Sequence, residues 1–349
     1  MSKNDEADVI GEVDNDELYE HFHILADKGQ SFLRIDRFLF DRIPNLSRNK
    51  IQQAATAGNI LVNGKVVKSN YKVHPLDDIS FVRPYPRREI ELIPEDIPLS
   101  VLYEDEDLII IDKPAGLVVH PGYGNYSGTL VNGLLYHFGG ESKIKTDDQR
   151  PGLVHRLDKN TTGTMVIAKT EESLTILSRY FFERSIERTY WALVWGDVVE
   201  ESGRIEGHIG RSLKNRKVMS VFPDGKFGKH AATNYKVLER FGYVTLVECK
   251  LETGRTHQIR VHFKHIGHPI FNDPEYGGDR IVKGTSFTKY KQFVQNCFDM
   301  IQRQALHAKT LGFVHPRTGK NLFFESELPE DFMSVVEKWR SYGTGNQKS

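Results

Sequence analysis

A proline-rich stretch divides this chain into two parts. The run Arg83–Arg88 contains Pro84 and Pro86, which disfavour helix, lack the backbone donor that a sheet needs and restrict the residue before them. A chain of 349 residues is also long for one average domain. We therefore predict two folded units, joined by a linker at residues 84–96.

The charges before and after residue 30 differ strongly. Residues 1–30 carry nine carboxylates against two lysines, whereas residues 31–72 hold eight Arg or Lys against two aspartates. An acidic arm beside a basic unit is typical of nucleic-acid-binding proteins, and the alternative is a solvated charged face. The chain as a whole is neutral, with 47 basic and 47 acidic residues, so only the distribution carries this signal. We predict an acidic N-terminal arm at residues 1–30 and a basic domain at residues 31–83.

Several classes of protein are disfavoured. No apolar run is long enough to cross a bilayer, and the acidic first 30 residues do not resemble a signal peptide, so we expect a cytoplasmic protein without a membrane partner. Cys249 and Cys297 lack any paired spacing, which argues against disulfides and thiolate metal sites. His262, His265 and His268 have no carboxylate or cysteine at ligand spacing, so no metal is expected.

The basic segment has the pattern helix, helix, hairpin. Its first apolar set recurs at helical spacing and comprises Phe32, Ile35, Phe38, Leu39 and Ile43. Pro44 interrupts that set, and Ser47 is expected to cap a second helix that ends at Gly58. Asn63 and Gly64 stand between two short β-rich runs, which is a strong hairpin signal.

Cations are spread over these expected elements. They are Arg34, Arg37, Arg48, Lys50 and Lys65. Because such side chains would be spaced on rigid secondary structure, they suit the phosphates repeated along a nucleic-acid strand. The runs at residues 34–39, 47–48 and 58–64 resemble the S4 family of small RNA-binding domains. That resemblance implies a small α/β domain that binds RNA, and it implies no chemistry.

Beyond the linker, strands and a few helices mix without the regular alternation of a doubly wound fold. Leu108–Ile111 reads as a short buried strand, and Thr164–Lys169 reads as another. The mixture predicts an α+β core over residues 97–335. Residues 336–349 are expected to form a C-terminal tail that is disordered from Gly343 onward.

One loop gathers cations around a carboxylate. Asp158 stands beside His155, Arg156 and Lys159. Positive neighbours keep a carboxylate ionised, which is the condition that a nucleophilic Asp needs. The alternative is that Asp158 only organises a turn through its side chain, and spacing alone does not decide between the two. Further along, Gly254 marks a turn, and Arg255 and Arg260 suit a carboxylate or a phosphate.

Five segments in order resemble the RluA-type pseudouridine synthases. They are Lys113–Gly116, His155–Asp158 with Thr161–Gly163, Thr189–Gly196, Gly254–His262 and Leu306–Ala308. The chain departs from the family at Thr162, where Ser is common, and both residues are small hydroxyl residues. The resemblance covers nearly all of the chain after residue 95. It implies a pseudouridine synthase-like core with a mixed, largely antiparallel sheet.

The resemblance also implies roles for single residues. Asp158 would be the nucleophile or base, at the ribose or at C6 of uracil. Tyr190 would lie over the base, with its hydroxyl near the proton that leaves C5, whereas its alternative role is a core aromatic. Arg260 would pair with Asp158, or else with a phosphate. Arg156 would enter the gap left when the target nucleotide leaves the stack, or else clamp a phosphate. The isomerisation has no redox step, so no cofactor is expected.

We therefore predict a monomeric RNA pseudouridine synthase. The S4-like domain resembles that of enzymes acting on large-subunit ribosomal RNA, so 23S RNA is the expected substrate and transfer RNA is the alternative. A non-catalytic ribosome-assembly factor is the main competing function, and the joint presence of Asp158, Tyr190 and Arg260 argues against it. A glycosidic hydrolase would need a second working carboxylate. The modified uridine cannot be read from short motifs, since recognition depends on RNA shape.

Overall fold

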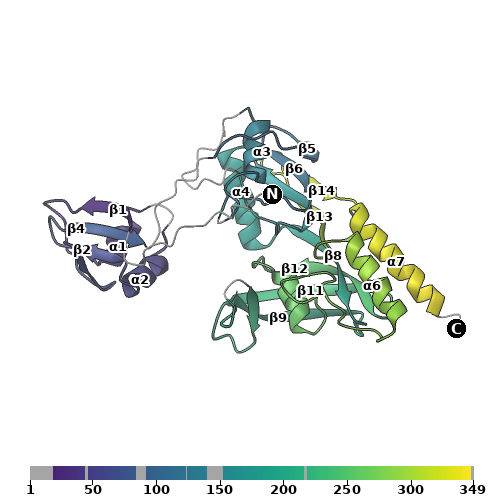
Figure 1. Cartoon of the computed structure of the whole chain (residues 1–349). Coiled ribbons are helices and arrows are strands. Elements are labelled where there is room, and N and C mark those ends of the chain that lie inside the picture. Colours follow the sequence, from purple (N-terminus) through teal and green to yellow (C-terminus); the bar gives the residue numbers. More distant parts are fainter. Residues whose placement is uncertain are drawn as a thin grey trace, which may run out of the picture. The chain divides into compact units, whose positions relative to one another are not determined.

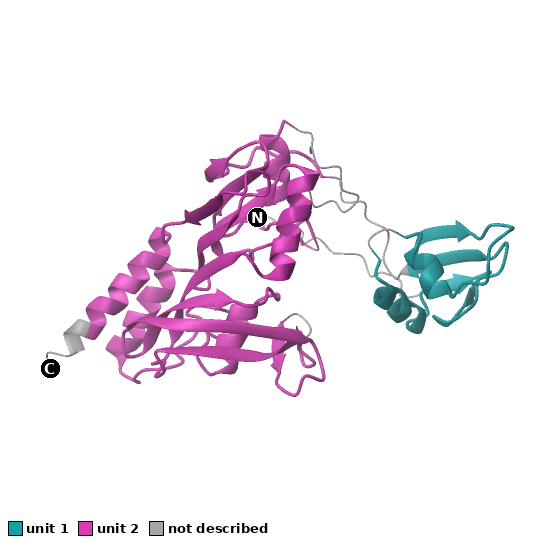
Figure 2. Cartoon of the chain, turned by 180° about the vertical axis from the view of Figure 1, so that it is seen from behind, with its two compact units in different colours: residues 1–91 teal, residues 92–349 magenta. Residues whose placement is uncertain are grey.

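The computed structural model describes residues 19–43, 46–83, 92–122, 124–139, 152–215 and 218–346. The chain divides into two compact units, residues 1–91 and residues 92–349 (Figure 2). The division falls within the expected linker at residues 84–96, of which residues 84–91 lie outside the described part of the chain.

Within its described residues, the N-terminal unit is a four-stranded sheet with two helices (Figure 1). The sheet has the order β1-β4-β2-β3 and the elements are β1 (Tyr19–Leu25), α1 (Ile35–Phe40), α2 (Arg48–Thr56), β2 (Ile60–Val62), β3 (Lys65–Val66) and β4 (Asp78–Arg83). Ile35 and Phe38 of α1 and Ile51 of α2 are buried against Ile60 and Phe81 of the sheet. The helices therefore form because each has an apolar face that the sheet covers.

Strand β1 corrects the expected acidic arm. It lies inside residues 1–30 and pairs antiparallel with β4, with Ile24 opposite Ile79. Phe22 and Ile24 pack against the core of the unit, so the alternation of these apolar residues outweighs the acidic composition around them. The expected bounds of the arm are therefore wrong from Tyr19 onward, and residues 1–18 lie outside the described part of the chain.

The predicted hairpin is present. Leu61 pairs with Val66 and Val62 pairs with Lys65 across the turn. Asn63 and Gly64 have φ values of 51° and 76°, the left-handed region that these two residue types tolerate best. Before it, the Ser47 side chain accepts a hydrogen bond from the backbone N–H of Lys50, so the predicted cap of α2 is present too.

In the part of the second unit that the structure describes, one ten-stranded sheet forms the core (Figure 1). Its order is β10-β9-β11-β12-β8-β13-β7-β6-β5, with β14 paired to β13. The strands are β5 (Val101–Glu104), β6 (Leu108–Lys113), β7 (Thr162–Ala168), β8 (Glu187–Trp195), β9 (Ser202–Arg211), β10 (Met219–Phe222), β11 (Lys229–Arg240), β12 (Val244–Leu251), β13 (Leu306–Val314) and β14 (Asn321–Glu325). Neighbours run antiparallel except β13 and β7, so the predicted mixed, largely antiparallel α+β core is confirmed.

The parallel contact fixes the start of β7. His307 stands opposite Thr162, and their side chains share a hydrogen bond of 2.8 Å between Nδ1 and Oγ1. Gly163 has a φ of 113°, and a Cβ atom there would lie 2.2 Å from the carbonyl oxygen of Ala308. Only glycine fits this close approach. The loop that carries Asp158 is thereby anchored at its C-terminal end.

Five helices accompany the sheet within the described residues, and none of the described helices is long and apolar enough to cross a membrane. They are α3 (Leu130–His137), α4 (Glu171–Glu183), α5 (Gln258–His265), α6 (Thr288–Met300) and α7 (Glu330–Asn346). The expected tail at residues 336–349 is wrong as far as Asn346, where α7 ends, and residues 347–349 lie outside the described part of the chain. Val336 and Trp339 are buried, and the Trp339 ring lies 6.2 Å from that of Trp195.

Candidate active site

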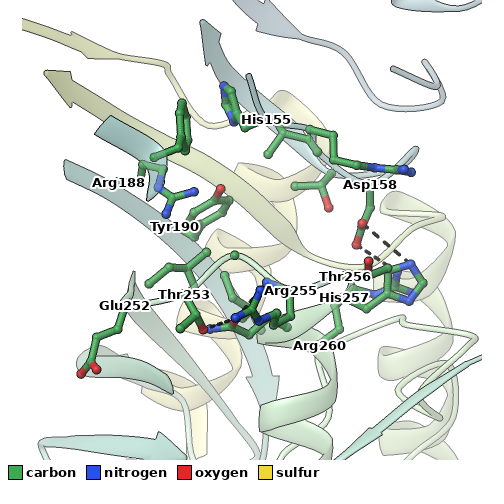
Figure 3. A pocket seen from close by; sticks show the side chains of 18 of the residues that line it. His155, Asp158, Arg188, Tyr190, Glu252, Thr253, Arg255, Thr256, His257 and Arg260 are labelled. Carbon is green, nitrogen blue, oxygen red and sulfur yellow. Dashed lines mark hydrogen bonds and ion pairs between the residues drawn. The ribbon is translucent and has the colours of Figure 1, made fainter. Parts of the chain in front are cut away.

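Three segments far apart in the sequence meet at one site (Figure 3). Asp158 comes from the loop before β7, Tyr190 from β8 and Arg260 from α5. Arg260 Nη1 donates a hydrogen bond of 3.2 Å to Asp158 Oδ2, across 102 residues of sequence. The structure thus brings together the carboxylate and the guanidinium that the family resemblance implied as partners.

Arg260 is held by two further carboxylates. Its Nε and Nη2 donate to both oxygens of Asp273, at 2.7 and 2.8 Å, and Nη2 also donates to Glu275. Burial alone would lower the pKa of Arg260, but the hydrogen bonds and charge of Asp273, with the charges of Asp158 and Glu275, raise it well above its usual range. The guanidinium is therefore a fixed cation. Sequence reasoning missed Asp273 and Glu275, since only their place in the fold distinguishes them from other acidic residues.

His257 lies on the other side of the Asp158 carboxylate. Its Nε2 is 3.8 Å from Asp158 Oδ1, and its Nδ1 is 2.8 Å from the hydroxyl of Tyr276. The residue precedes α5 with a φ of 55°, a strained backbone for a side chain of this size and a conformation that clusters at functional sites. Burial lowers the pKa of His257, which favours a neutral imidazole beside the carboxylate.

Two cavities meet at Asp158. One of about 440 Å³ is lined by Tyr190, Leu157 and Leu306 together with polar groups of the loop before α5. The other, of about 920 Å³, lies along residues 118–122 and the Asp158 loop. Arg156, Asp158, His257 and Arg260 line both cavities. Tyr190 therefore reaches a cavity while it also packs in the core, so the two roles considered for it are compatible.

The charge around Asp158 differs in one respect from the expectation. His155 stacks on Phe181, with ring centroids 4.6 Å apart, and its Nε2 accepts the backbone N–H of Val166. Burial, assisted by the charge of Arg188, lowers the pKa of His155 to about 3, so this residue is neutral. The expectation that His155 supplies positive charge to Asp158 is wrong. Arg156, by contrast, is exposed at the rim.

Lys113 holds the loop that carries Asp158 through hydrogen bonds to backbone carbonyls. Its side chain is fully buried, and Nζ donates to the backbone carbonyls of Pro114, Leu117 and Lys159 at 2.7, 2.9 and 3.0 Å. Burial lowers the pKa of Lys113 to about 7, yet three carbonyl acceptors need three protons, which only the ammonium form supplies. The Lys-Pro motif of the sequence thus has a structural role that its pattern did not reveal.

The five cations of the N-terminal unit that were predicted to contact RNA fall into two groups. Arg34 and Arg48 are half exposed and donate to the fully buried carboxylate of Asp36, which also accepts from Gln52. The second group is exposed at the surface and comprises Arg37, Lys50 and Lys65. Asp36 was counted in the sequence only as a charge, whereas in the structure it fixes the direction of two arginines.

One group of described residues has the donors of a metal site, namely Asp105, Asp107 and His315. His315 Nε2 lies 2.8 Å from Asp105 Oδ2, and Asp107 pairs with Arg317. The donors are thus engaged with one another and with a cation. Of the histidines considered for a metal, His262 bonds the Thr233 hydroxyl at 2.9 Å.

Comparisons with known proteins agree with this geometry. Residues 107–265 match the RNA pseudouridylate synthase family, and residues 33–79 match the S4 domain. An uncharacterized RNA pseudouridine synthase of Chlorobaculum parvum is 50% identical over 324 residues, covering 92% of this chain and 98% of that protein. Ribosomal large subunit pseudouridine synthase D of Pseudomonas aeruginosa is 42% identical over 307 residues, covering 88% and 92%.

A solved structure gives the same result. Human RNA pseudouridylate synthase domain containing 4 superimposes with a TM-score of 0.51 at 25% identity, over 69% of this chain and 93% of that one. The matched family and its relatives define an enzyme that rearranges nucleosides within RNA. The chain belongs to the RNA pseudouridine synthase family and carries an S4 domain at its N-terminal end. The predicted family and enzyme class are confirmed.

Proposed function

We propose that this enzyme isomerises uridines of large-subunit ribosomal RNA, with Asp158 as the nucleophile and without a cofactor. The observation that carries the proposal is the Asp158 carboxylate, oriented by Arg260 at the junction of two cavities. The relative from Pseudomonas aeruginosa is named for ribosomal large-subunit RNA, which favours that substrate over transfer RNA. Such a substrate also implies a cytoplasmic enzyme, and we expect it to act as a monomer.

The reaction needs one covalent rearrangement and no change of oxidation state. The bond from C1′ to N1 breaks, the base turns, C5 bonds to C1′, C5 loses its proton and N1 gains one. Asp158 is the group that attacks, and attack at C1′ or at C6 would use the same oriented carboxylate. Arg260 and His257 lie at opposite oxygens of that carboxylate, so its direction is set before the RNA arrives.

Tyr190 and Arg156 are proposed to contact the target nucleotide. The Tyr190 ring offers the uracil a stacking surface inside the cavity, and its hydroxyl would lie near the proton that leaves C5. Arg156 is exposed where both cavities open, which suits a side chain that fills the place of an everted nucleotide. Arg37, Lys50 and Lys65 would contact phosphates, and Arg34 and Arg48 would do so from the positions that Asp36 sets.

The test is the variant Asp158→Asn, which keeps the size of the side chain and removes its charge. Transcribed 23S RNA and transfer RNA are incubated with each protein, and pseudouridine is mapped by carbodiimide adducts. We expect modification of 23S RNA by the wild type and none by the variant, with RNA affinity nearly unchanged. Modification of transfer RNA alone would refute the substrate, and full activity of the variant would refute the nucleophile. Binding without modification by the wild type would support an assembly factor instead.

A further inference from the structure

Arg188 lies in the same cavity as Tyr190. The two residues are two positions apart on β8, so their side chains leave the same face of the strand. Both line the 440 Å³ cavity. Figure 3 shows the Arg188 guanidinium beside the Tyr190 ring, with its nitrogen atoms turned towards the hydroxyl end of that ring. The cavity that would receive the uracil therefore contains a cation that the catalytic pair does not use.

No carboxylate neutralises Arg188 among the residues that the structure describes. Its Nε is buried and has no hydrogen-bond partner there. The guanidinium instead lies 5.0 Å from the ring centre of Phe181, a contact that holds a cation in place without neutralising it. Arg255, which lines the same cavity, differs because its Nε donates to the carbonyl of His230. Leaving a buried donor unpaired costs free energy, so a missing acceptor is a reason to look for a ligand.

The charge of Arg188 acts on the cavity wall. Burial is the main cause that lowers the pKa of His155, and the charge of Arg188 is the second cause. Burial raises the pKa of the Tyr190 hydroxyl, and the charge of Arg188 opposes that rise. Negative charge inside the cavity would therefore be stabilised by Arg188, in a site where little water competes.

We propose that Arg188 is a further catalytic residue, which donates to a carbonyl oxygen of the target uracil and stabilises the base as an anion. The proposal rests on the proposed function. When the bond from C1′ to N1 breaks, the bonding electron pair stays with the base, and its charge spreads over N1 and the two carbonyl oxygens. The charge is consumed when C5 bonds to C1′, the C5 proton leaves and N1 is protonated. No oxidant or co-reactant is needed.

The experiment compares a poor and a good leaving base. Arg188→Gln, Arg188→Lys and the control Arg179→Gln, whose side chain is exposed on α4, are assayed against RNA with uridine or 5-fluorouridine at the target position. Single-turnover consumption of the target nucleoside is followed at saturating RNA by nuclease digestion and mass spectrometry. The fluorine atom already stabilises the anionic base, so this substrate depends less on an external cation.

We expect Arg188→Gln to lose roughly 100- to 1,000-fold in rate on uridine, the typical loss of an oxyanion donor. The loss on 5-fluorouridine should be about tenfold smaller, which corresponds to about 1.4 kcal/mol in the activation free energy. Arg188→Lys should keep part of the rate, and Arg179→Gln should match the wild type on both substrates.

Two outcomes would overturn the proposal. Equal losses on both substrates would give Arg188 a purely structural role. A normal rate at saturating RNA, with weaker binding and a smaller dependence of affinity on salt, would make it a phosphate contact. Failure of the proposed function is a separate result, because it would show in the wild type as an absence of pseudouridine, whereas failure of this inference shows only in the variants of an active enzyme.

Discussion

Replacing Arg260 by alanine tests the architecture of the site most directly, because one side chain joins three carboxylates. Arg260 is 4% exposed, and the side chain of its partner Asp273 is fully buried. The substitution leaves that carboxylate without a cation inside the protein. It also removes the only described group that donates a hydrogen bond to Asp158 Oδ2.

The magnitude follows from that burial. Removing one partner of a buried ion pair typically costs about 3 to 5 kcal/mol. For a unit of this size, 1 kcal/mol corresponds to roughly 2 to 4 °C in Tm, so Arg260→Ala should lower Tm by about 6 to 20 °C. Arg260→Lys should recover only part of the activity, since an ammonium cannot bond both oxygens of Asp273 in the two-pronged geometry.

The assay pairs thermal unfolding with single-turnover rates at saturating RNA, measured well below the lowered Tm. Asp158→Asn is the matched control, because it removes the proposed nucleophile while Arg260 keeps Asp273. We expect Arg260→Ala to lose stability and rate together, and Asp158→Asn to lose rate alone. An unchanged Tm with a normal rate for Arg260→Ala would refute the reasoning and make Arg260 a phosphate contact.

Two further predictions concern features outside the site. Burial alone would raise the pKa of Asp36, but hydrogen bonds from Arg34, Gln52 and Arg48 hold it well below its usual range. The stabilisation by the Asp36 carboxylate is therefore complete above its unfolded pKa, roughly 4, and is lost as pH falls below that value. Asp36→Asn should remove this pH dependence and lower the free energy of unfolding in denaturant by about 2 kcal/mol. An unchanged dependence of stability on acid pH in the variant would contradict this prediction. Trp339→Ala should cost about 3 to 5 kcal/mol in thermal unfolding of the second unit, whereas a dispensable tail would show no change.

The sequence predicted what local chemistry determines. The hairpin at Asn63 and Gly64 and the cap at Ser47 depend on a few adjacent residues, and both are present. The α+β class of the second unit followed from the mixture of strand and helix patterns in its sequence. The errors lie at the ends of units, where composition was read over a whole segment: acidic residues concealed β1, and a presumed tail contains Trp339 of the core.

The candidate active site could be predicted only in part from the sequence, for a different reason. Asp158 and Arg260 were suggested by motifs, but Asp273, His257 and Arg188 acquire their meaning from what they touch. Asp273 is one Asp among many until α5 places Arg260 against it. Arg188 stands out because its partner is missing, and a missing partner is a property of three-dimensional packing.

The parallel pairing of β7 with β13 also determines when the enzyme becomes complete during synthesis. The N-terminal unit contains all strands of its own sheet by residue 83, so it can fold as soon as it leaves the ribosome. The loop of Asp158 must wait for Arg260, which is 102 residues later, and β7 must wait for β13, later still. Such distant contacts form slowly. A growing chain therefore gains its RNA-binding unit well before it gains the ability to change a uridine.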